Sequence, residues 1–332
     1  MSRLFAGSMR SYKRRRLIKA EAPVNPHYGK LPTERTVAES IDNGVIIVDK
    51  PMGPSSHQVA AWVRDIFAVS KAGHGGTLDP NVSGVLPVAL GNATKAIGLL
   101  HVAGKEYVAV MRLHGDVAEN RIREACAQFI GTISQMPPEQ AAVKREERER
   151  TIYRLDVLEI YGHDVLFVVE CEGGTYIRVL CEDIGTALGC GAHMHALRRT
   201  RSGAFEENDV YNLHEVLDAY LFGRDDGDQG IKNIIRPVED LLVHLPAIVI
   251  RDSAVDAICH GAYLMLPGIS QVDTGIEPGD EVAVMTLKGE GVAIGTACLA
   301  TRDLVGQDQG VAVETNRVLM RKNTYPALWK KH

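Results

Sequence analysis

Apolar residues recur along the chain at the spacings of both strands and helices. A continuous apolar run at 44–48, which ends at Pro51, predicts a buried strand. Residues 106–114 alternate between apolar and polar positions, as half-buried strands do, and further strands are predicted at 152–160 and 165–171. The first half of the chain therefore supplies several strands of a sheet.

Helical spacing of apolar residues predicts amphipathic helices among these strands. Ser55 or Ser56 can cap the first helix, Gly131 fits as the C-terminal cap of the second, and a further helix spans 213–221. Three apolar faces can be listed: Val59, Trp62, Val63, Ile66 and Phe67; Ile122, Ala125, Cys126, Phe129 and Ile130; Ile177, Leu180, Cys181, Ile184 and Leu188. Helices and strands do not alternate regularly, which favours the α+β class over a doubly wound fold.

Two segments lack an apolar period. Residues 136–150 carry charges of both signs, which predicts a mobile exposed segment, and residues 222–230 are polar and rich in glycine, as surface loops are. The segment Cys190–His195 offers soft ligands, but it has no fourth ligand at a standard spacing, so we expect no metal there. In the family described below this segment opens a helix.

The character of the sequence changes after about Leu245, where short strand signals dominate. These signals lie at 247–250, 281–286 and 292–300, with a hairpin turn predicted at 288–291. The chain therefore divides into an extension at 1–43, a large domain at 44–244 and a compact β domain at 245–329.

Composition is that of an ordinary water-soluble protein. The 332 residues are 45% apolar and 24% charged, which suits two packed domains, and no apolar run approaches the length of a membrane span. The N-terminus has no apolar signal region, so we expect a cytoplasmic protein without a membrane partner. Six scattered cysteines without a C-x-x-C pair indicate reduced thiols rather than a disulfide framework or a zinc ribbon.

Charge is distributed unevenly. Residues 1–36 contain nine basic and two acidic side chains, which leaves a net charge of -12 on the rest of a chain whose total is -5. A basic arm on an acidic body is typical of a protein that binds a polyanion. A disordered solubilising tail has the same composition, and the arm alone does not separate the two interpretations.

The densest cluster of glycines surrounds one carboxylate. Residues 71–80 read Lys-Ala-Gly-His-Gly-Gly-Thr-Leu-Asp-Pro, and Pro80 keeps Asp79 out of helical geometry. The glycine spacing fits neither a P-loop nor a dinucleotide-binding loop. Asp79 is therefore a candidate nucleophile, with an ordinary turn-initiating aspartate as the alternative.

Five motifs, in family order, resemble those of TruB-family pseudouridine synthases. They are residues 44–51, residues 73–80 with 83–87, residues 104–107, residues 173–178 and residues 195–200. Five ordered motifs are far more specific than one loop. The resemblance runs from Gly44 through the C-terminal β domain and implies a mixed, mostly antiparallel catalytic sheet.

The resemblance also implies an activity, the isomerisation of uridine to pseudouridine in RNA. This reaction exchanges a C–N for a C–C glycosidic bond without a redox step, so no cofactor and no metal are expected. Asp79 would be the ionised carboxylate, held charged by Arg178 in a water-poor pocket. Tyr107 would stack on the flipped base, and Tyr176 would move a proton.

Three further residues would support the site. Leu197 would form a wall of the uracil pocket, and His74 would take the space that the extruded base leaves. Lys50 would support the Asp79 loop or contact RNA, with an exposed lysine at a strand end as the alternative. Ser56-His57 has no third member of a triad and is interpreted as a helix cap.

The C-terminal domain resembles a PUA domain, a small β-barrel that binds RNA. The residues that carry this likeness are 260–262 and 266–269, so His260, Gly261, Ala262 and Pro267 are candidate RNA contacts. Together with residues 199–205 and the basic arm, they resemble the archaeal form of the dyskerin-type, guide-RNA-dependent branch.

That branch implies a catalytic subunit of a box H/ACA ribonucleoprotein. Its partners would be guide RNA, an rRNA or tRNA substrate, two small proteins of the Nop and Gar types, and a kink-turn-binding homologue of a ribosomal protein. The extension would pack partly on the PUA domain. Two alternatives remain: a stand-alone enzyme for the T-loop uridine of tRNA, and a catalytically idle RNA scaffold.

Overall fold

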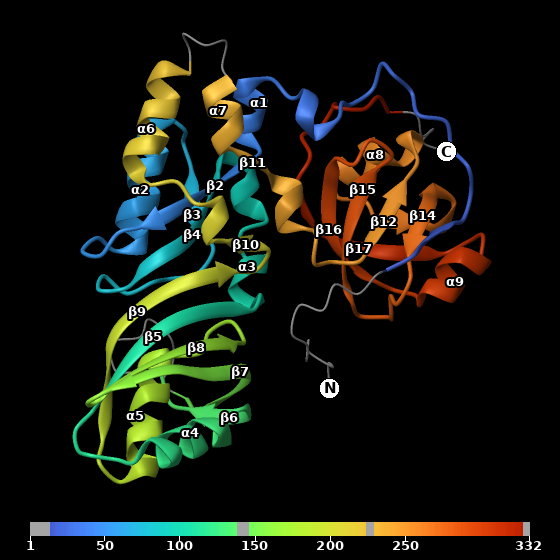
Figure 1. Cartoon of the computed structure of the whole chain (residues 1–332). Helices are drawn as coiled ribbons and strands as arrows, with labels where there is room; N and C mark the ends of the chain where they lie inside the picture. The colour runs from blue at the N-terminus through green and yellow to red at the C-terminus, as the bar shows by residue number, and fades with distance from the viewer. Residues whose placement is uncertain (1–13, 138–145, 224–228, 328–332) are drawn as a thin grey trace.

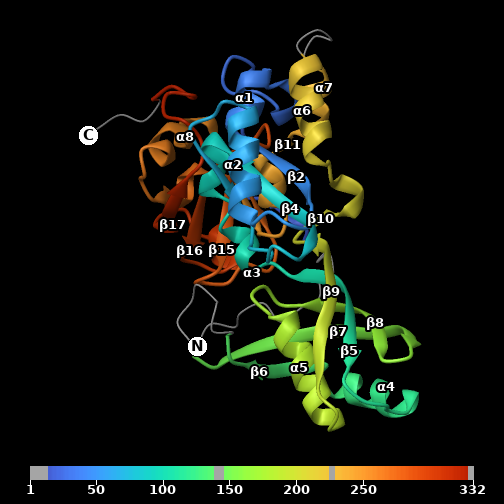
Figure 2. The same ribbon diagram turned by 90° about the vertical axis from the view of Figure 1, so that its left-hand side faces the viewer.

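The computed structural model describes residues 14–137, 146–223 and 229–327. In these residues the strands form two sheets of different size. Ten strands form one sheet and seven form the other. Figure 1 shows the larger sheet with its helices beside the smaller, strand-rich unit at the C-terminal end of the chain, and Figure 2 gives the view from the side. The α+β class and the mostly antiparallel pairing expected from the sequence are confirmed.

The larger sheet has the order β11-β2-β4-β9-β5-β8-β7-β6, with β3 paired to β4 and β10 paired to β9. Only two residue pairs, Ser83↔Arg198 and Gly84↔Arg199, join its halves, through the parallel contact of β4 with β9. The strands are β2 (Gly44–Lys50), β3 (Ala72–His74), β4 (Ser83–Leu90), β5 (Lys105–Leu113), β6 (Gly131–Gln135), β7 (Arg148–Tyr161), β8 (Asp164–Cys171), β9 (Ala192–Ser202), β10 (Phe205–Glu206) and β11 (Arg236–Pro237).

Helices cover this sheet in two groups. Near β2 and β4 the core is closed by α2 (Ser56–Ile66), α6 (Leu213–Phe222) and α7 (Gln229–Ile234). Around β5, β7 and β8 it is closed by α4 (Glu119–Gln128) and α5 (Ile177–Leu188). The other helices of this part are α1 (Val37–Asp42) and α3 (Leu99–Val102), with single turns η2 (Gly91–Lys95), η3 (Glu207–Asp209) and η4 (Val238–Leu241).

The smaller sheet has the order β1-β14-β12-β15-β16-β17-β13 and encloses a core of its own. Its strands are β1 (Arg16–Ile18), β12 (Ala247–Ile250), β13 (Leu264–Met265), β14 (Ile269–Asp273), β15 (Glu281–Thr286), β16 (Gly291–Ala297) and β17 (Val311–Val318). Its helices are α8 (Asp252–Cys259) and α9 (Thr301–Gly306), with the turn η5 (Leu266–Gly268). The hairpin predicted at 288–291 joins β15 to β16.

Several local predictions are wrong. Gly131 does not cap the second helix, α4, which ends at the C-cap Phe129, and instead begins β6. Ile130, expected on the apolar face of that helix, is exposed. Trp62 lies exposed on α2, and Ala60 occupies the buried position beside Val59 and Val63. The charged residues from Arg148 onward already belong to β7, because they pair with β6. Residues 192–202 form β9 rather than opening a helix. Part of each predicted loop, 138–145 and 224–228, lies outside the described residues.

The N-terminal extension runs along the smaller sheet before it reaches the larger one (Figure 1). Arg16 pairs with Asp273 at 2.9 Å, and Lys19 donates to the Leu304 carbonyl at 2.8 Å. After the turn η1 (Pro32–Glu34), the chain enters α1. The described part of the basic arm is therefore folded, and several of its charges already have partners within the protein.

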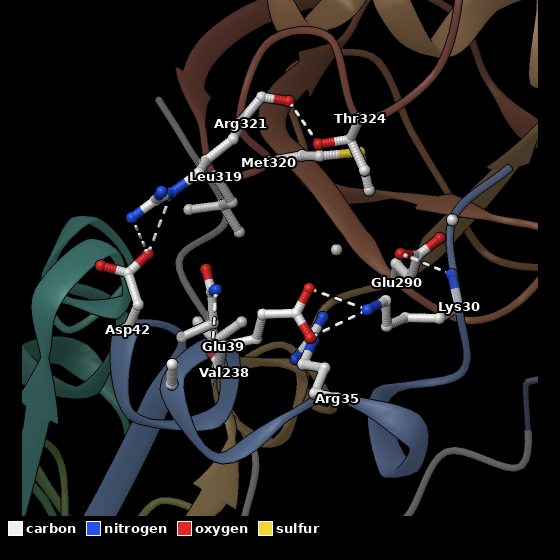
Figure 3. A pocket seen from close by; sticks show the side chains of 14 residues that line it. Lys30, Arg35, Glu39, Asp42, Val238, Glu290, Leu319, Met320, Arg321 and Thr324 are labelled. Carbon is white, nitrogen blue, oxygen red and sulfur yellow. Dashed lines mark hydrogen bonds and ion pairs between the residues drawn. The ribbon is translucent and has the colours of Figure 1, made fainter.

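A cavity of about 310 Å³ lies where the extension, the larger domain and the β domain meet. Figure 3 shows its charged side chains already engaged with one another, as in the Lys30–Glu39 pair at 2.8 Å and the Arg321–Asp42 pair at 2.8 Å. Behind it the apolar cluster that contains Val45 and Leu242 continues into the β domain through Ile294. The two domains therefore share a packed boundary.

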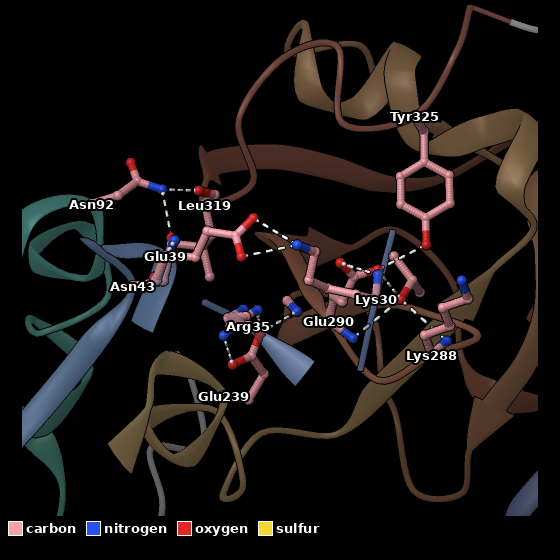
Figure 4. A network of polar contacts seen from close by, with 12 residues as sticks. Lys30, Arg35, Glu39, Asn43, Asn92, Glu239, Lys288, Glu290, Leu319 and Tyr325 are labelled. Atoms are coloured by element: carbon pink, nitrogen blue, oxygen red, sulfur yellow. Dashed lines mark hydrogen bonds and ion pairs between the residues drawn. The ribbon is translucent and has the colours of Figure 1, made fainter. Parts of the chain in front are cut away.

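A buried polar network crosses the same boundary (Figure 4). Arg35 of the extension donates to both carboxylate oxygens of Glu239, at 2.7 and 2.8 Å, and the Gly291 N–H of β16 donates to the same carboxylate at 2.8 Å. Glu290 accepts from the Tyr325 hydroxyl at 2.7 Å and from the Lys30 N–H at 3.2 Å. Glu239 thus connects all three parts of the chain.

Candidate active site

Asp79 lies in the turn between β3 and β4, beside the narrow contact between the two halves of the larger sheet. Its neighbours Leu78 and Val82 are buried in the core that also contains Tyr107 and Ile177. The Val82 N–H closes the turn by donating to the Asp79 carbonyl at 3.0 Å. With apolar side chains anchored on both sides, the carboxylate is directed outward.

Two buried polar side chains hold this turn from below. The Ser56 hydroxyl donates to the Leu78 carbonyl at 3.0 Å and accepts from the Leu78 N–H at 2.8 Å. Lys50 is 0% exposed and donates to the carbonyls of Val82 at 2.7 Å, Pro51 at 2.9 Å and Pro80 at 3.4 Å. The interpretation of Lys50 as an exposed lysine is wrong, because its ammonium group is buried and hydrogen-bonded to three backbone carbonyls that support the Asp79 loop.

Replacing Lys50 by methionine is expected to loosen the turn. The buried carbonyls lose their donor, which costs about 1–3 kcal/mol of unfolding free energy, and displacement of Asp79 lowers turnover roughly tenfold to a hundredfold. Urea unfolding and single-turnover kinetics measure the two effects. Lys71→Met, at an exposed lysine ahead of the same loop, is the matched control and should change neither. Wild-type turnover in Lys50→Met would show that the turn does not need the ammonium group.

Arg178 reaches Asp79 from the first turn of α5 and forms an ion pair with it. The two residues are 99 positions apart in the sequence, so the pair depends on the packing of α5 against the sheet. The Asp79 side chain is 51% exposed. The expected water-poor pocket is therefore not provided by the protein alone, and a bound substrate would have to cover this carboxylate.

The aromatic and apolar site candidates lie on neighbouring strands. Tyr107 of β5 is paired with Arg199 of β9, and Leu197 is paired with Ala109 two residues away. Tyr107 is 8% exposed, and burial raises the pKa of its hydroxyl, which Arg199 partly offsets. Leu197 is half-buried against the same core. The site therefore offers an apolar floor beside the Asp79–Arg178 pair.

Arg199 is a buried residue whose part in the site the sequence analysis did not recognise. Its guanidinium donates to the Val85 carbonyl at 2.8 Å and to the Gly76 carbonyl at 3.3 Å, so it ties the Asp79 loop to β9. Gly84 permits this approach, because a Cβ there would lie 2.2 Å from the Arg199 carbonyl oxygen. The signal in the sequence is the arginine pair of the fifth motif, but nothing in the sequence says which arginine is buried.

His74 lies at the end of β3, close to the Asp79 loop. Its ring meets that of His57 edge-on, with centroids 4.6 Å apart, and the nearest ring nitrogens are 3.4 Å apart. Burial lowers the pKa of His74 to about 4, with smaller contributions from His57 and other cations. His74 is therefore neutral near pH 7. Ser55, rather than the Ser56-His57 pair, caps α2.

Lys105 is a second buried cation that the sequence analysis left without a role. It donates to the carbonyls of Leu100 and Ala103 at 2.6 and 2.7 Å. Burial lowers the pKa of its ammonium group to about 7. It lies against Gly76 of the Asp79 loop, where a Cβ would be 3.8 Å from the lysine Cε.

The structure brings Asp79, Arg178, Tyr107 and Leu197 to one region, and Tyr176 precedes α5 in the same region, half-buried. The candidate RNA contacts of the β domain lie elsewhere, on the exposed stretch after α8. His260, Gly261, Ala262 and Pro267 are all exposed there. His260 closes α8, with its ring nitrogen 2.8 Å from the Asp256 carbonyl.

No cluster of three or more histidine, cysteine or acidic side chains suited to a metal ion occurs among residues 14–137, 146–223 and 229–327. Across the same three ranges, no helix combines the length and the apolar character needed to cross a membrane.

Four family models match the chain. They describe the N-terminal domain of TruB family pseudouridylate synthases at residues 64–177, the C-terminal domain of tRNA pseudouridylate synthase B at 178–243, a PUA domain at 246–319 and a DKCLD (NUC011) domain at 9–60.

Curated proteins and solved structures match over nearly the whole chain. A "probable tRNA pseudouridine synthase B" of Methanopyrus kandleri is 55% identical over 95% of this chain and 94% of its own. One of Methanocaldococcus jannaschii is 52% identical over the same shares. A chain from an H/ACA RNP bound to a substrate RNA containing 2'-deoxyuridine superposes with a TM-score of 0.89 at 49% identity, covering 96% of this chain and 98% of that one. A chain from a Cbf5-Nop10-Gar1 complex gives 0.90 at 50% identity, covering 95% and 96%.

Proposed function

The chain belongs to the TruB family of pseudouridylate synthases, and we propose that it is the catalytic subunit of a box H/ACA guide ribonucleoprotein. The observation that supports catalysis most directly is the ion pair of Asp79 with Arg178 on an outward-facing turn. The assembly is supported by the end-to-end similarity to chains solved within H/ACA complexes, which extends over the N-terminal extension and the PUA region.

In this proposal, Asp79 acts on the target nucleoside. The bond between C1' of the ribose and N1 of uracil breaks and its electron pair stays on N1, the detached base turns, and C1' bonds to C5. The proton on C5 then leaves to water and N1 takes up a proton, so no atom is gained or lost overall. Arg178 keeps the carboxylate charged once the substrate covers it, because an unpaired carboxylate in a dry site would take up a proton. The guanidinium thus offsets the desolvation that substrate binding causes.

The remaining site residues would hold the base. Tyr107 and Leu197 present an apolar surface to the detached uracil, and the Tyr176 hydroxyl is the candidate for a proton relay. His74, neutral near pH 7, can take the stacking position that the extruded base leaves. Extrusion costs a few kcal/mol, which binding elsewhere on the RNA must offset.

That binding would come from the β domain. We assign residues 44–244 to catalysis, residues 245–329 to a PUA domain and residues 1–43 to an extension laid against it. The exposed residues His260, Gly261, Ala262 and Pro267 would grip the ACA end of the guide RNA. Proteins of the Nop10 and Gar1 types would dock on the catalytic domain, and a kink-turn binder would join through the RNA.

The alternative is a stand-alone enzyme for the T-loop uridine of tRNA, which the names of the curated relatives favour. A scaffold without catalysis is disfavoured by the charge-paired Asp79, since RNA binding alone needs no such pair.

Tritium release from 5-labelled uridine separates these functions. Wild-type protein is assayed on rRNA fragments and on tRNA, with and without guide RNA and the small partner proteins. We expect turnover of the rRNA fragment with the matching guide, and loss of that turnover with a guide of scrambled sequence. Release from tRNA without guide would establish the stand-alone enzyme, and no release under any condition would leave only the scaffold.

A further inference from the structure

A buried side-chain amide holds the backbone from which Tyr176 and Arg178 project. Gln135, the last residue of β6, is 2% exposed. Its Nε2 donates to the Tyr176 carbonyl at 3.1 Å, and its Oε1 accepts from the Tyr176 N–H at 3.0 Å. The side-chain amide therefore hydrogen-bonds to both the backbone N–H and the backbone carbonyl of Tyr176, as the backbone of a neighbouring strand would.

Tyr176 sits where such a restraint has most effect. It is the N-cap of α5, and its own side chain makes no capping hydrogen bond. Its carbonyl also accepts from the Leu180 N–H at 3.0 Å, the first bond of the helix. Arg178, which pairs with Asp79, lies in that first turn. A shift at Tyr176 is therefore passed to the guanidinium without an intervening flexible segment.

Packing alone does not require an amide at position 135. A leucine or methionine of similar size would fill the space, but it would leave the part-buried Tyr176 N–H without its partner in the protein. The amide thus fills the space and also fixes the orientation of the Tyr176 backbone through its two hydrogen bonds. It links strand β6 to the start of α5 across 41 positions of sequence.

We propose that Gln135 is a positioning residue for the isomerisation, one that orients Tyr176 and the Arg178–Asp79 pair through the backbone at the start of α5. This inference rests on the proposed function, because it concerns the same site. Within the described part of the chain the Gln135 amide hydrogen-bonds to Tyr176 and not to Asp79 or Arg178, so its effect is expected on the chemical step and not on RNA affinity.

Two substitutions test the role. Gln135→Leu removes both hydrogen bonds and is expected to lower the single-turnover rate at saturating RNA at least tenfold, with Kd for RNA within twofold of wild type. Gln135→Glu keeps the shape but places a carboxylate against the Tyr176 carbonyl. When protonated, the introduced carboxyl group can again donate to that carbonyl and accept from the N–H.

The replacement of the amide by a carboxyl group determines how the rate of Gln135→Glu should change with pH. Burial at position 135 and the facing Tyr176 carbonyl raise the pKa of the introduced carboxyl above that of a free glutamate. Arg148, opposite position 135 on β7, and the Tyr176 N–H act in the other direction and reduce this shift. The rate of Gln135→Glu relative to wild type should therefore be highest at acid pH and fall as pH rises. If Gln135 only stabilised the fold, the rate of Gln135→Glu at saturating RNA would not recover at acid pH, provided that the variant is folded at every pH tested.

Ser134→Ala is the matched control, on the same strand but with an exposed side chain, and should leave rate and pH profile unchanged. Two outcomes would overturn the inference while the proposed function stands. One is a rate for Gln135→Leu within twofold of the wild-type rate. The other is a rate of Gln135→Glu, relative to wild type, that does not change with pH. Absence of wild-type turnover on every RNA overturns the proposed function instead. Amide hydrogen exchange then still tests the restraint: exchange at Tyr176 should accelerate at least tenfold in Gln135→Leu, and unchanged exchange overturns it.

Discussion

Asp79→Asn is expected to lower turnover at least about a thousandfold, while RNA affinity stays within about tenfold of the wild-type value. The amide has nearly the size of the carboxylate but no negative charge, so it can neither attack the nucleoside nor stabilise a cationic sugar. The turn is held through its backbone by Lys50 and Ser56, and it should therefore keep its shape. Single-turnover tritium release and filter binding of the same RNA measure the two quantities.

Asp65→Asn is the matched control for this substitution. Asp65 is an exposed aspartate on α2 that pairs with Arg64, and its replacement should change neither quantity. Turnover of Asp79→Asn above a few per cent of wild type would remove Asp79 from the chemistry. A loss of RNA binding far beyond tenfold would mean that the carboxylate serves binding or folding instead.

The central pair of the site could be anticipated from the sequence because each member lies in a distinctive motif. The glycine-rich loop with Pro80 singles out Asp79, and the motif that begins at Gly173 brings Arg178 to the start of a helix. Strands β5 and β8 could also be predicted, because their buried and half-buried residues alternate along the chain.

What could not be anticipated depends on contacts between distant positions. Lysine is rarely buried, so the sequence alone left an exposed Lys50 open as an alternative. The fold decides against it by supplying carbonyls up to 32 positions away that accept from the ammonium group. Gln135 carries no motif of its own that marks it as a partner of Tyr176. Residues 192–202 form a strand because β5 offers a partner along most of their length, whereas the family resemblance led us to expect the start of a helix at 190–195.

The basic arm shows the same limit for charge. Its composition suits either RNA binding or disorder, and both interpretations treat the charges as free. In the described part, Arg16, Lys30 and Arg35 instead pair with acids that lie far along the sequence or in the next helix. Net charge therefore overstates what this segment can offer to RNA.

Glu239→Ala is expected to lower the free energy of unfolding by about 3–5 kcal/mol, because it leaves the buried Arg35 guanidinium without its counter-ion. The two side chains are only 11% and 10% exposed, so the pair is largely shielded from bulk water. The Gly291 N–H of the β domain loses its acceptor at the same time. Urea unfolding measures the loss, and the surface variant Asp65→Ala should cost less than about 1 kcal/mol.

A double variant distinguishes the effect of the unpaired charge from the effect of the lost side-chain volume. Arg35→Met with Glu239→Gln removes both charges together and keeps an oxygen for the Gly291 N–H, so it should recover most of the stability that Glu239→Ala loses. Equal destabilisation by the single and the double variant would show that the pair is not what holds the boundary. If the boundary also sets where the β domain presents RNA to Asp79, the double variant should regain guide-dependent turnover together with stability, since the apolar packing from Val45 to Ile294 remains in place.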